Sequence, residues 1–329
     1  MSEDLRSIRP AQAALARDPG IIPGGAFARG AVLGALIGDA AGATLEFLGR
    51  KPTTDEVERA LGMCGGGIWR LSPGQVTDDG EMTLALLQAL AGQDRYDVRR
   101  AAQAYRRWFL SDPFDIGMAT ANALEEGDLE SPDLAELIAA RALEFNAGSK
   151  ANGSLMRATP LGAWSARVSL EEAVEAARAD ARLTHPNPSC QWSTAAYVVA
   201  IRHLVLNPGD NVGAFDAARL ILPEGESDEV RRWLDNAAVG RLPPFHPQAG
   251  FVMIAFTYAF HHLLQRTPHV QALRETLHGG GDTDTNACIV GGLLGALWGE
   301  RGVSGEMRGA VFESDFDKRR NNKTLHKAC

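Results

Sequence analysis

Two carboxylates and a hydroxyl stand side by side in Thr77-Asp78-Asp79, directly before the segment 80–91. Apolar residues recur at helical spacing in that segment, so we expect a helix that begins at these three residues. One interpretation is helix capping, because Thr or Asp caps and acidic first turns stabilise a helix N-terminus. The other interpretation is a site where the oxygens bind a ligand.

A second acidic group has the same form. The run GGGDTDT at residues 279–285 precedes the apolar segment 287–298. Capping accounts for one acid at a helix start, but not for two acids after three glycines. Glycines let the backbone turn tightly and approach a ligand closely. The second group therefore favours a binding site.

If the fold brings both groups together, four carboxylates and two threonine hydroxyls converge. So much like charge repels, and cations would relieve the repulsion. All the donors are oxygens, and neither group contains Cys or His, which favours Mg²⁺ or Mn²⁺ over zinc or copper. Four carboxylates exceed what one Mg²⁺ usually needs, so a two-metal site is expected.

The elements that position these groups are expected to be helices. Apolar residues have helical spacing in segments such as 132–145, 169–182 and 189–206, and alternating patterns of strand type are scarce. Many of the 35 glycines lie inside apolar helical patterns, where they indicate close helix packing or ligand approach. We predict one all-α domain over residues 26–315, preceded by an N-terminal extension and linker (1–25) and followed by a basic tail (316–329).

Composition excludes several classes of protein. The 329 residues carry a formal net charge of −8, which argues against a nucleic-acid binder that relies on a broad basic surface. The sequence shows neither a secretory signal nor an apolar run near the ~20 residues that span a bilayer. The four cysteines are scattered, with no Cys-x-x-Cys, so neither a disulfide framework nor a zinc knuckle is indicated. A cytoplasmic protein without membrane or nucleic-acid partners is expected.

Three further segments, with the two acidic groups, resemble the ADP-ribosylglycohydrolase family. They are GALIGDAAG at 34–42 followed by Glu46-Phe47, NGSLMR at 152–157 followed by Pro160-Leu161-Gly162, and Thr184-His185-Pro186. They occur in the order that the family shows and cover roughly residues 26–300. Each segment is weak alone, but together with GGDTDTN they make the match specific.

The resemblance implies a single helical domain around a cleft that holds two divalent ions. The implied metal ligands are Thr77, Asp78, Asp79, Asp282, Asp284 and Thr285. The implied catalytic residues are Glu46, near the metals and the substrate ribose, with Asp79 and Asp284. The implied substrate-binding residues are Asp115, Asn152, Gly153, Ser154, Leu155 and His185. Backbone amides of residues 153–155 would hold the diphosphate.

Several of these residues also have structural interpretations. Asn152-Gly153 has the composition of a simple turn, although a Gly-Ser turn also exposes amides that bind phosphate. A lone histidine such as His185 is more often a core or capping residue. Asp115 is equally well interpreted as the N-cap of a helix near 116–126. Arg157, one helical turn past Gly153, is more simply a salt-bridge partner than a substrate contact.

The implied reaction is removal of ADP-ribose from a modified protein side chain, first of all arginine. Ser-linked and O-acetyl-linked ADP-ribose are alternatives. Some family relatives are crystallin-like structural proteins, which loss of metal-site carboxylates would favour, and none is missing here. A two-metal phosphoesterase is a further alternative, but such enzymes usually recruit His. Family relatives also protect bacteria from ADP-ribosylating toxins, so the extension 1–25 could contact an ADP-ribosyltransferase partner.

Overall fold

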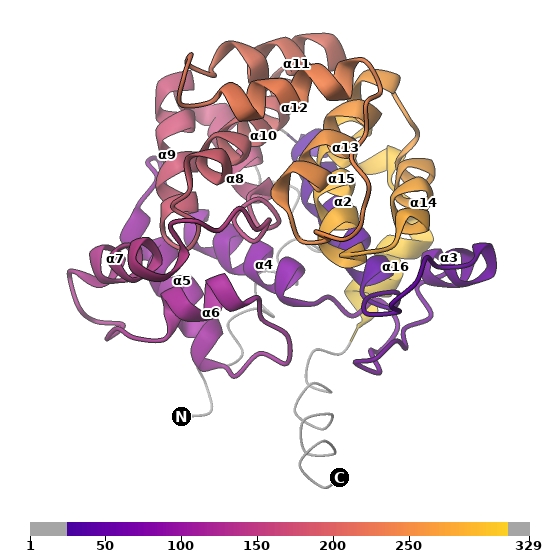
Figure 1. Cartoon of the computed structure of the whole chain (residues 1–329), viewed down its shortest axis with the longest axis horizontal. Coiled ribbons are helices and arrows are strands. Elements are labelled where there is room, and N and C mark those ends of the chain that lie inside the picture. The colour runs from indigo at the N-terminus through magenta and orange to yellow at the C-terminus, as the bar shows by residue number, and fades with distance from the viewer. Residues whose placement is uncertain (1–24, 315–329) are drawn as a thin grey trace, which may run out of the picture.

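The computed structural model describes residues 25–314, which form helices joined by loops (Figure 1). In this part of the chain, β pairing is limited to two isolated bridges, Gly66–Leu71 and Ala151–Phe251. The all-α prediction is therefore confirmed. The predicted extension, apart from Gly25, and the predicted tail 316–329 lie outside the described residues, so these domain boundaries stay predictions.

The helices follow one another with loops of varied length. The α-helices are α2 (Gly25–Gly42), α3 (Thr54–Leu61), α4 (Asp78–Leu90), α5 (Val98–Leu110), α6 (Met118–Leu124), α7 (Leu134–Asn146), α8 (Thr159–Trp164), α9 (Leu170–Arg182), α10 (Pro188–Leu206), α11 (Asn211–Leu220), α12 (Asp228–Ala238), α13 (Val252–Gln265), α14 (His269–Gly279), α15 (Thr283–Trp298) and α16 (Gly305–Glu313). Short 3₁₀ turns follow α8 and α15, at Ser165–Arg167 and Glu300–Gly302.

Local sequence explains where several surface helices begin. In α3 the hydroxyl of Thr53 accepts from the Glu56 amide while the Glu56 carboxylate accepts from the Thr53 amide. In α9, Ser169 and Glu172 form the same reciprocal pair. These capping boxes satisfy amides that have no partner within the helix. Neither of the two predicted acidic groups caps its helix in this way, as described below.

The centre of the molecule is the pair α2 and α15, which has the most extensive contact of any two helices in the described chain. Both helices are buried along almost their whole length. Around them lie α13 and α14 on one side and α4, α8 and α10 on the other, with α11 and α12 covering α10 and α13 (Figure 1). Buried apolar residues from all of these helices form one continuous core.

Glycines let α2 and α15 approach backbone to backbone. A glycine recurs every four residues on the face of α2 that meets α15, which confirms the close packing predicted from the sequence. A Cβ added at Gly30, Gly34, Gly38 or Gly42 would lie 2.4, 2.2, 2.0 and 2.3 Å from the carbonyl oxygens of Gly295, Gly291, Ala287 and Thr283 respectively. Where α2 ends and α15 begins, the Thr283 hydroxyl donates to the Gly42 carbonyl at 2.8 Å. This contact therefore fixes the start of α15 relative to the end of α2.

Candidate metal and substrate cleft

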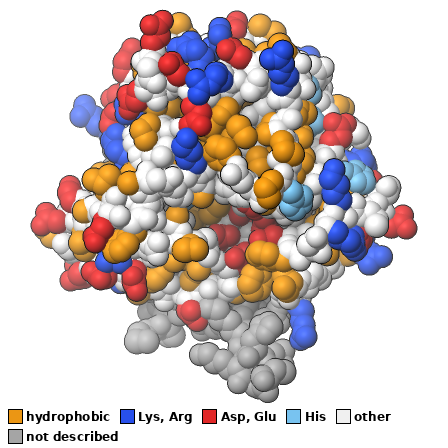
Figure 2. Space-filling model, in the orientation of Figure 1, with side chains coloured by type: hydrophobic (Ala, Val, Ile, Leu, Met, Phe, Trp, Pro, Cys, Tyr) orange, Lys and Arg blue, Asp and Glu red, His pale blue; other side chains and the backbone are white. Residues whose placement is uncertain are grey.

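A cleft of about 830 Å³ opens beside the N-terminal ends of α4 and α15. Figure 2 shows acidic side chains at the bottom of this hollow, framed by hydrophobic side chains. Residues from many separate segments line it. They are Leu45, Glu46, Phe47, Leu48, Gly49, Arg50, Asp78, Asp115, Ile116, Gly117, Met118, Ala119, Thr120, Asn122, Phe145, Asn146, Ser149, Ala151, Asn152, Gly153, Met156, His185, His246, Ala249, Gly250, Gly281, Asp282, Asp284 and Thr285.

The first acidic group begins α4, but it does so without side-chain capping. Thr77 is the N-cap residue, and its side chain makes no capping hydrogen bond. Its hydroxyl donates instead to Oδ1 of Asp39 at 2.8 Å. Asp39, which is buried in α2, also accepts from the backbone amides of Thr77 and Gly80. Asp39 thus takes the place of the cap and fixes the turn that carries Asp78 and Asp79.

The second acidic group begins α15. Asp282 is its N-cap residue and likewise makes no side-chain capping bond. Gly280 and Gly281 precede it with φ of 72° and 77°, in the left-handed region that glycine adopts readily. The turn delivers Asp282, Asp284 and Thr285 to the cleft wall. Neither N-cap residue therefore caps its helix through its side chain, although both groups place acids in the first turn of a helix.

The structure meets the condition for a shared site, because it brings the two acidic groups together. The Thr285 hydroxyl donates to Oδ2 of Asp79 at 3.2 Å, which joins residues 206 apart in the sequence. Asp78 lines the cleft and accepts a 3.4 Å hydrogen bond from the Gly117 amide. Thr77 and Asp79 are buried and do not line the cleft themselves.

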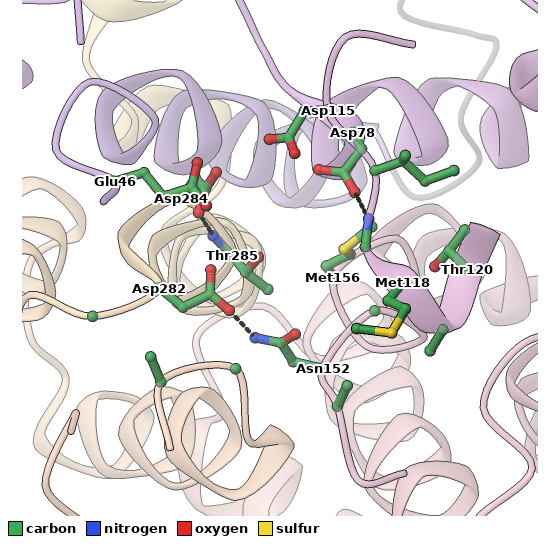
Figure 3. Close-up of a pocket in the computed structure, with 18 of the residues that line it drawn as sticks. Glu46, Asp78, Asp115, Met118, Thr120, Asn152, Met156, Asp282, Asp284 and Thr285 are labelled. Carbon is green, nitrogen blue, oxygen red and sulfur yellow. Dashed lines mark hydrogen bonds between the residues drawn. The ribbon is translucent and has the colours of Figure 1, made fainter. Parts of the chain in front are cut away.

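Glu46 and Asp115 complete the acidic site. Each contributes a carboxylate oxygen that lies, with an oxygen of Asp284, in a group whose members are all within 4.8 Å of one another. Figure 3 shows Glu46 beside Asp284, with Asp115 and Asp78 next to them. Asp115 does not cap the next helix, because α6 begins at Met118 with Gly117 as its N-cap residue.

Burial and mutual repulsion raise the pKa values of these carboxyl groups. Burial, then repulsion from Asp115, raises the pKa of Glu46 to about 8. Burial, then repulsion from Asp282, raises the pKa of Asp115 to about 6. Burial, followed by neighbouring carboxylates, raises the pKa values of Asp78, Asp79 and Asp284 well above the ordinary aspartate range. The site therefore crowds acidic groups together without enough positive charge to offset them.

Basic side chains do not offset this charge. Among the described residues that line the cleft, Arg50 is the one Arg or Lys, and it pairs with Glu56 at 2.7 Å. Oδ1 of Asp79 is buried with no hydrogen-bond partner. A buried carboxylate oxygen without a partner is costly, and a hard cation would satisfy it. The donor set therefore fits Mg²⁺ or Mn²⁺.

The predicted diphosphate turn also lines the cleft, next to the acidic residues. Asn152 and Gly153 line it, and the Asn152 side-chain amide donates to Oδ2 of Asp282 at 2.7 Å (Figure 3). Ser154 and Leu155 are buried beneath the surface of the turn. The Ser154 hydroxyl pairs with that of Thr194 at 3.2 Å, and the Leu155 amide donates to the Asn152 carbonyl at 2.8 Å.

His185 lies beside this turn. It lines the cleft although it is only 1% exposed. A Cβ added at Gly153 would come within 2.8 Å of its Cε1 and 3.0 Å of its Nε2, so only glycine lets the ring lie this close. Arg157 lies behind the turn and forms a fully buried ion pair with Asp180, in agreement with the simpler prediction for it.

Two residues that contact the proposed site residues are not predicted by the sequence patterns. Asp39 lies inside the GALIGDAAG segment, and its carboxylate within an otherwise apolar helical pattern was the available signal. Trp69 donates from Nε1 to Oε2 of Glu46 at 3.2 Å. It follows the glycine run 65–67, whose three residues all have positive φ, and nothing in the local pattern indicated its partner.

Within residues 25–314, no helix is both long and apolar enough to cross a bilayer.

Comparisons with known proteins agree with the geometry. The model of the ADP-ribosylglycohydrolase family matches residues 26–327. The chain is 29% identical to the ADP-ribosyl-(dinitrogen reductase) glycohydrolase of Rhodospirillum rubrum, over 83% of this chain and 85% of the relative. It is 30% identical to the ADP-ribosylarginine hydrolase Tri1 of Pseudomonas putida (strain GB-1), over 85% of this chain and 72% of the relative. A solved ADP-ribosylglycohydrolase-related protein complex is similar in fold, with a TM-score of 0.71, 26% identity and coverage of 91% of this chain and 95% of that chain.

Proposed function

Because this chain belongs to the ADP-ribosylglycohydrolase family, whose named relatives include an ADP-ribosylarginine hydrolase, we propose that its substrate is a protein carrying ADP-ribose on an arginine side chain. The observation that carries the proposal is that acidic residues and a glycine turn line the same cleft. One wall presents the carboxylates of Glu46, Asp78, Asp282 and Asp284, and the other presents the turn at Gly153.

The acidic wall is the proposed metal and ribose site. Two divalent ions, Mg²⁺ or Mn²⁺, would be held by Thr77, Asp78, Asp79, Asp282, Asp284 and Thr285. When bound, such ions supply Lewis-acid polarisation of oxygen and offset the acidic charge. The oxygen donors, the unpartnered Oδ1 of Asp79 and the raised carboxyl pKa values support this assignment.

Glu46 is the proposed proton-transfer residue. Hydrolysis breaks the bond between the anomeric carbon and the guanidine nitrogen, and it joins a water oxygen to that carbon. The leaving nitrogen takes up a proton, and the attacking water loses one. Glu46 lines the cleft, and a carboxyl group there can give a proton to the leaving nitrogen or accept one from water. Trp69 orients this carboxyl by its hydrogen bond to Oε2.

Charge favours arginine as the modified side chain. Glu46 and Asp115 place carboxylates together at the cleft wall, where a guanidinium would be attracted. An ether or ester linkage, as in Ser-linked or O-acetyl-linked ADP-ribose, would bring no such positive charge. These linkages are the alternative substrates of the same site.

The wall at the Gly153 turn is the proposed diphosphate site. Amides exposed at a glycine turn can bind phosphate oxygens without a basic groove. Gly153 and Asn152 line the cleft, and His185 lies beside them. The Leu155 amide donates within the turn, and the Ser154 hydroxyl pairs with Thr194. We therefore expect Ser154 and Leu155 to support binding by holding the turn in shape.

The decisive experiment is release of ADP-ribose from an arginine-modified protein, with Mg²⁺ and with a chelator. Serine-modified protein and O-acetyl-ADP-ribose are run beside it. Faster release from arginine that depends on Mg²⁺ is the expected result. Faster release from another linkage would replace the arginine assignment. ADP-ribose binding without release from any linkage would support the inactive, crystallin-like alternative.

A role in protection from an ADP-ribosylating toxin is part of this proposal, with the extension 1–25 as the proposed contact for the toxin. The extension contains both apolar and basic residues, including Leu5, Ile8, Arg6 and Arg9. We expect deletion of residues 1–24 to leave hydrolysis of a small ADP-ribosyl-arginine substrate nearly intact, because all the proposed site residues and Asp39, which supports them, lie beyond residue 24. Lost hydrolysis would contradict this independence, and unchanged binding to a candidate transferase would contradict the contact.

A further inference from the structure

A buried polar cluster lies behind the Gly153 turn, outside the acidic site. Asp180 is its centre and is fully buried in α9. Its Oδ1 accepts from the hydroxyls of Tyr96 at 3.0 Å and Tyr105 at 2.8 Å, and its Oδ2 accepts from Nε of Arg157 at 3.1 Å. The Arg157 guanidinium also lies over the Tyr105 ring, 4.4 Å from its centroid. These contacts hold the guanidinium in one orientation.

The fixed guanidinium reaches two segments of the diphosphate wall. Nη1 of Arg157 donates to the Gly153 carbonyl at 3.3 Å and to the Thr184 hydroxyl at 2.8 Å. The same hydroxyl lies 2.8 Å from Nδ1 of His185. A continuous chain of hydrogen bonds therefore runs from Asp180 to the imidazole at the cleft.

The direction of the last hydrogen bond in this chain follows from chemistry. Thr184 is fully buried, so its single hydroxyl proton needs an acceptor within the protein. Among the described residues, the groups within hydrogen-bond distance of Oγ1 are the guanidinium, which only donates, and Nδ1 of His185. The hydroxyl therefore accepts from Arg157 and donates to Nδ1. An imidazole that accepts at Nδ1 carries its proton at Nε2.

The rest of the ring faces the ligand side. Its Cε1–Nε2 edge packs against Gly153, and both residues line the cleft. The ring is neutral, because burial and then the Arg157 charge lower the pKa of His185 to about 3.

We propose that Arg157 and Thr184 are positioning residues that lock His185 as the Nε2–H tautomer, a neutral donor aimed at a phosphate oxygen of the ligand. The inference rests on the proposed function for the identity of the ligand. A diphosphate oxygen only accepts hydrogen bonds, so the other tautomer would turn a lone pair toward it. The arrangement provides an N–H donor while the positive charge of Arg157 stays buried and fixed on Asp180.

The tautomer is tested directly by ¹H–¹⁵N NMR of the imidazole nitrogens in the full-length protein, with His185→Leu used to assign the signal. We expect a protonated Nε2 and an unprotonated Nδ1 across neutral pH. In Thr184→Val, which removes the hydroxyl, we expect the Nδ1–H form to appear. In Thr184→Ser, which restores the hydroxyl, we expect the wild-type signal to return. A protonated Nδ1 in the wild-type protein would overturn the proposal.

Binding of ADP-ribose then tests the consequence of the tautomer. Loss of one hydrogen bond to a charged group should raise the Kd of Thr184→Val about tenfold or more, with Thr184→Ser near wild type. The same Thr184→Val change is made in a His185→Leu background, where we expect no further loss. An equal loss in both backgrounds would show a merely structural role and overturn the proposal. Failure of the wild-type protein to bind ADP-ribose would contradict the proposed function, while the NMR result would still decide the tautomer.

Discussion

The Asn152 side-chain amide donates to Oδ2 of Asp282 at 2.7 Å, a contact between residues 130 apart in the sequence. It connects the proposed diphosphate turn directly to the acidic turn before α15 (Figure 3). One oxygen of a proposed metal ligand is thereby oriented by a residue of the proposed substrate wall. The two halves of the cleft are therefore one hydrogen-bonded unit.

The acidic site should be needed for turnover but not for folding. We expect Asp79→Asn and Asp284→Asn to lower the rate of ADP-ribose release by about 100-fold or more, because preorganised charge is lost. Without metal, each variant should melt at or above the wild-type temperature, because a repelling carboxylate is gone. Release assays and thermal melts check both expectations, with exposed Asp133→Asn as the matched control. Unchanged Mg²⁺-dependent release in both variants would refute the metal-ligand assignment.

Asp39 should behave differently from its acidic neighbours. Its carboxylate accepts hydrogen bonds from the Thr77 amide, the Thr77 hydroxyl and the Gly80 amide. In Asp39→Asn, the side-chain NH₂ group would face these donors and could not accept from them. We expect a loss of about 2 kcal/mol in the free energy of unfolding, together with lost turnover. Urea unfolding of the metal-free protein measures the first. Stability equal to that of wild type would show that Asp39 does not hold the α4 turn.

The glycine contact between α2 and α15 should tolerate no side chain. A Cβ at Gly38 would lie 2.0 Å from the Ala287 carbonyl oxygen, so we expect Gly38→Ala to cost about 3 kcal/mol of stability or to prevent folding. Gly309→Ala in α16 is the control, because no atom lies within 4 Å of its Cβ. That control should gain about 0.5–1 kcal/mol from helix propensity. Similar melting temperatures for the two variants would contradict the close packing.

The metal-free protein should lose stability as pH rises. Asp115, Asp39 and Glu46 have raised pKa values of about 6, 7 and 8, against ordinary values of 3.8, 3.8 and 4.5. The folded state therefore binds more protons than the unfolded state in this window, and this contribution to stability is lost as pH rises from about 4 to 8.

Mg²⁺ competes with these protons, so its stabilising effect should grow over the same range. Melting temperatures from pH 5 to 8, with Mg²⁺ and with chelator, measure both trends. A metal-free melting temperature that rises across this range would contradict the assigned shifts.

Local patterns in the sequence predicted several of the helices. Segments 169–182 and 189–206 became α9 (Leu170–Arg182) and α10 (Pro188–Leu206), since apolar spacing and polar helix starts are local signals. The two acidic turns could also be found, because each combines residues that capping alone does not explain. The glycines inside apolar helices correctly indicated close packing.

Partners distant in the sequence could not be found in the same way. The spacing of glycines in α2 indicates a close neighbour but does not say that the neighbour is α15. Asp39 bonds a turn 38 residues later, and Trp69 reaches back 23 residues to Glu46. Such pairs depend on how the helices cross, which no local pattern records. The proposed roles of individual site residues stay predictions until the variants above are measured.

The backbone contact between α2 and α15 also fixes the first turn of α15, which carries the cleft residues Asp284 and Thr285. Amides along 30–42 and 285–297 should exchange with deuterium only when the whole domain unfolds, since the two helices cannot separate without opening the core. Substrate entry and product departure must then take place at the rim, where Phe47 and Met118 are 63% and 79% exposed. Changes at these rim residues should alter how fast product leaves, while the first turn of α15 stays fixed against α2.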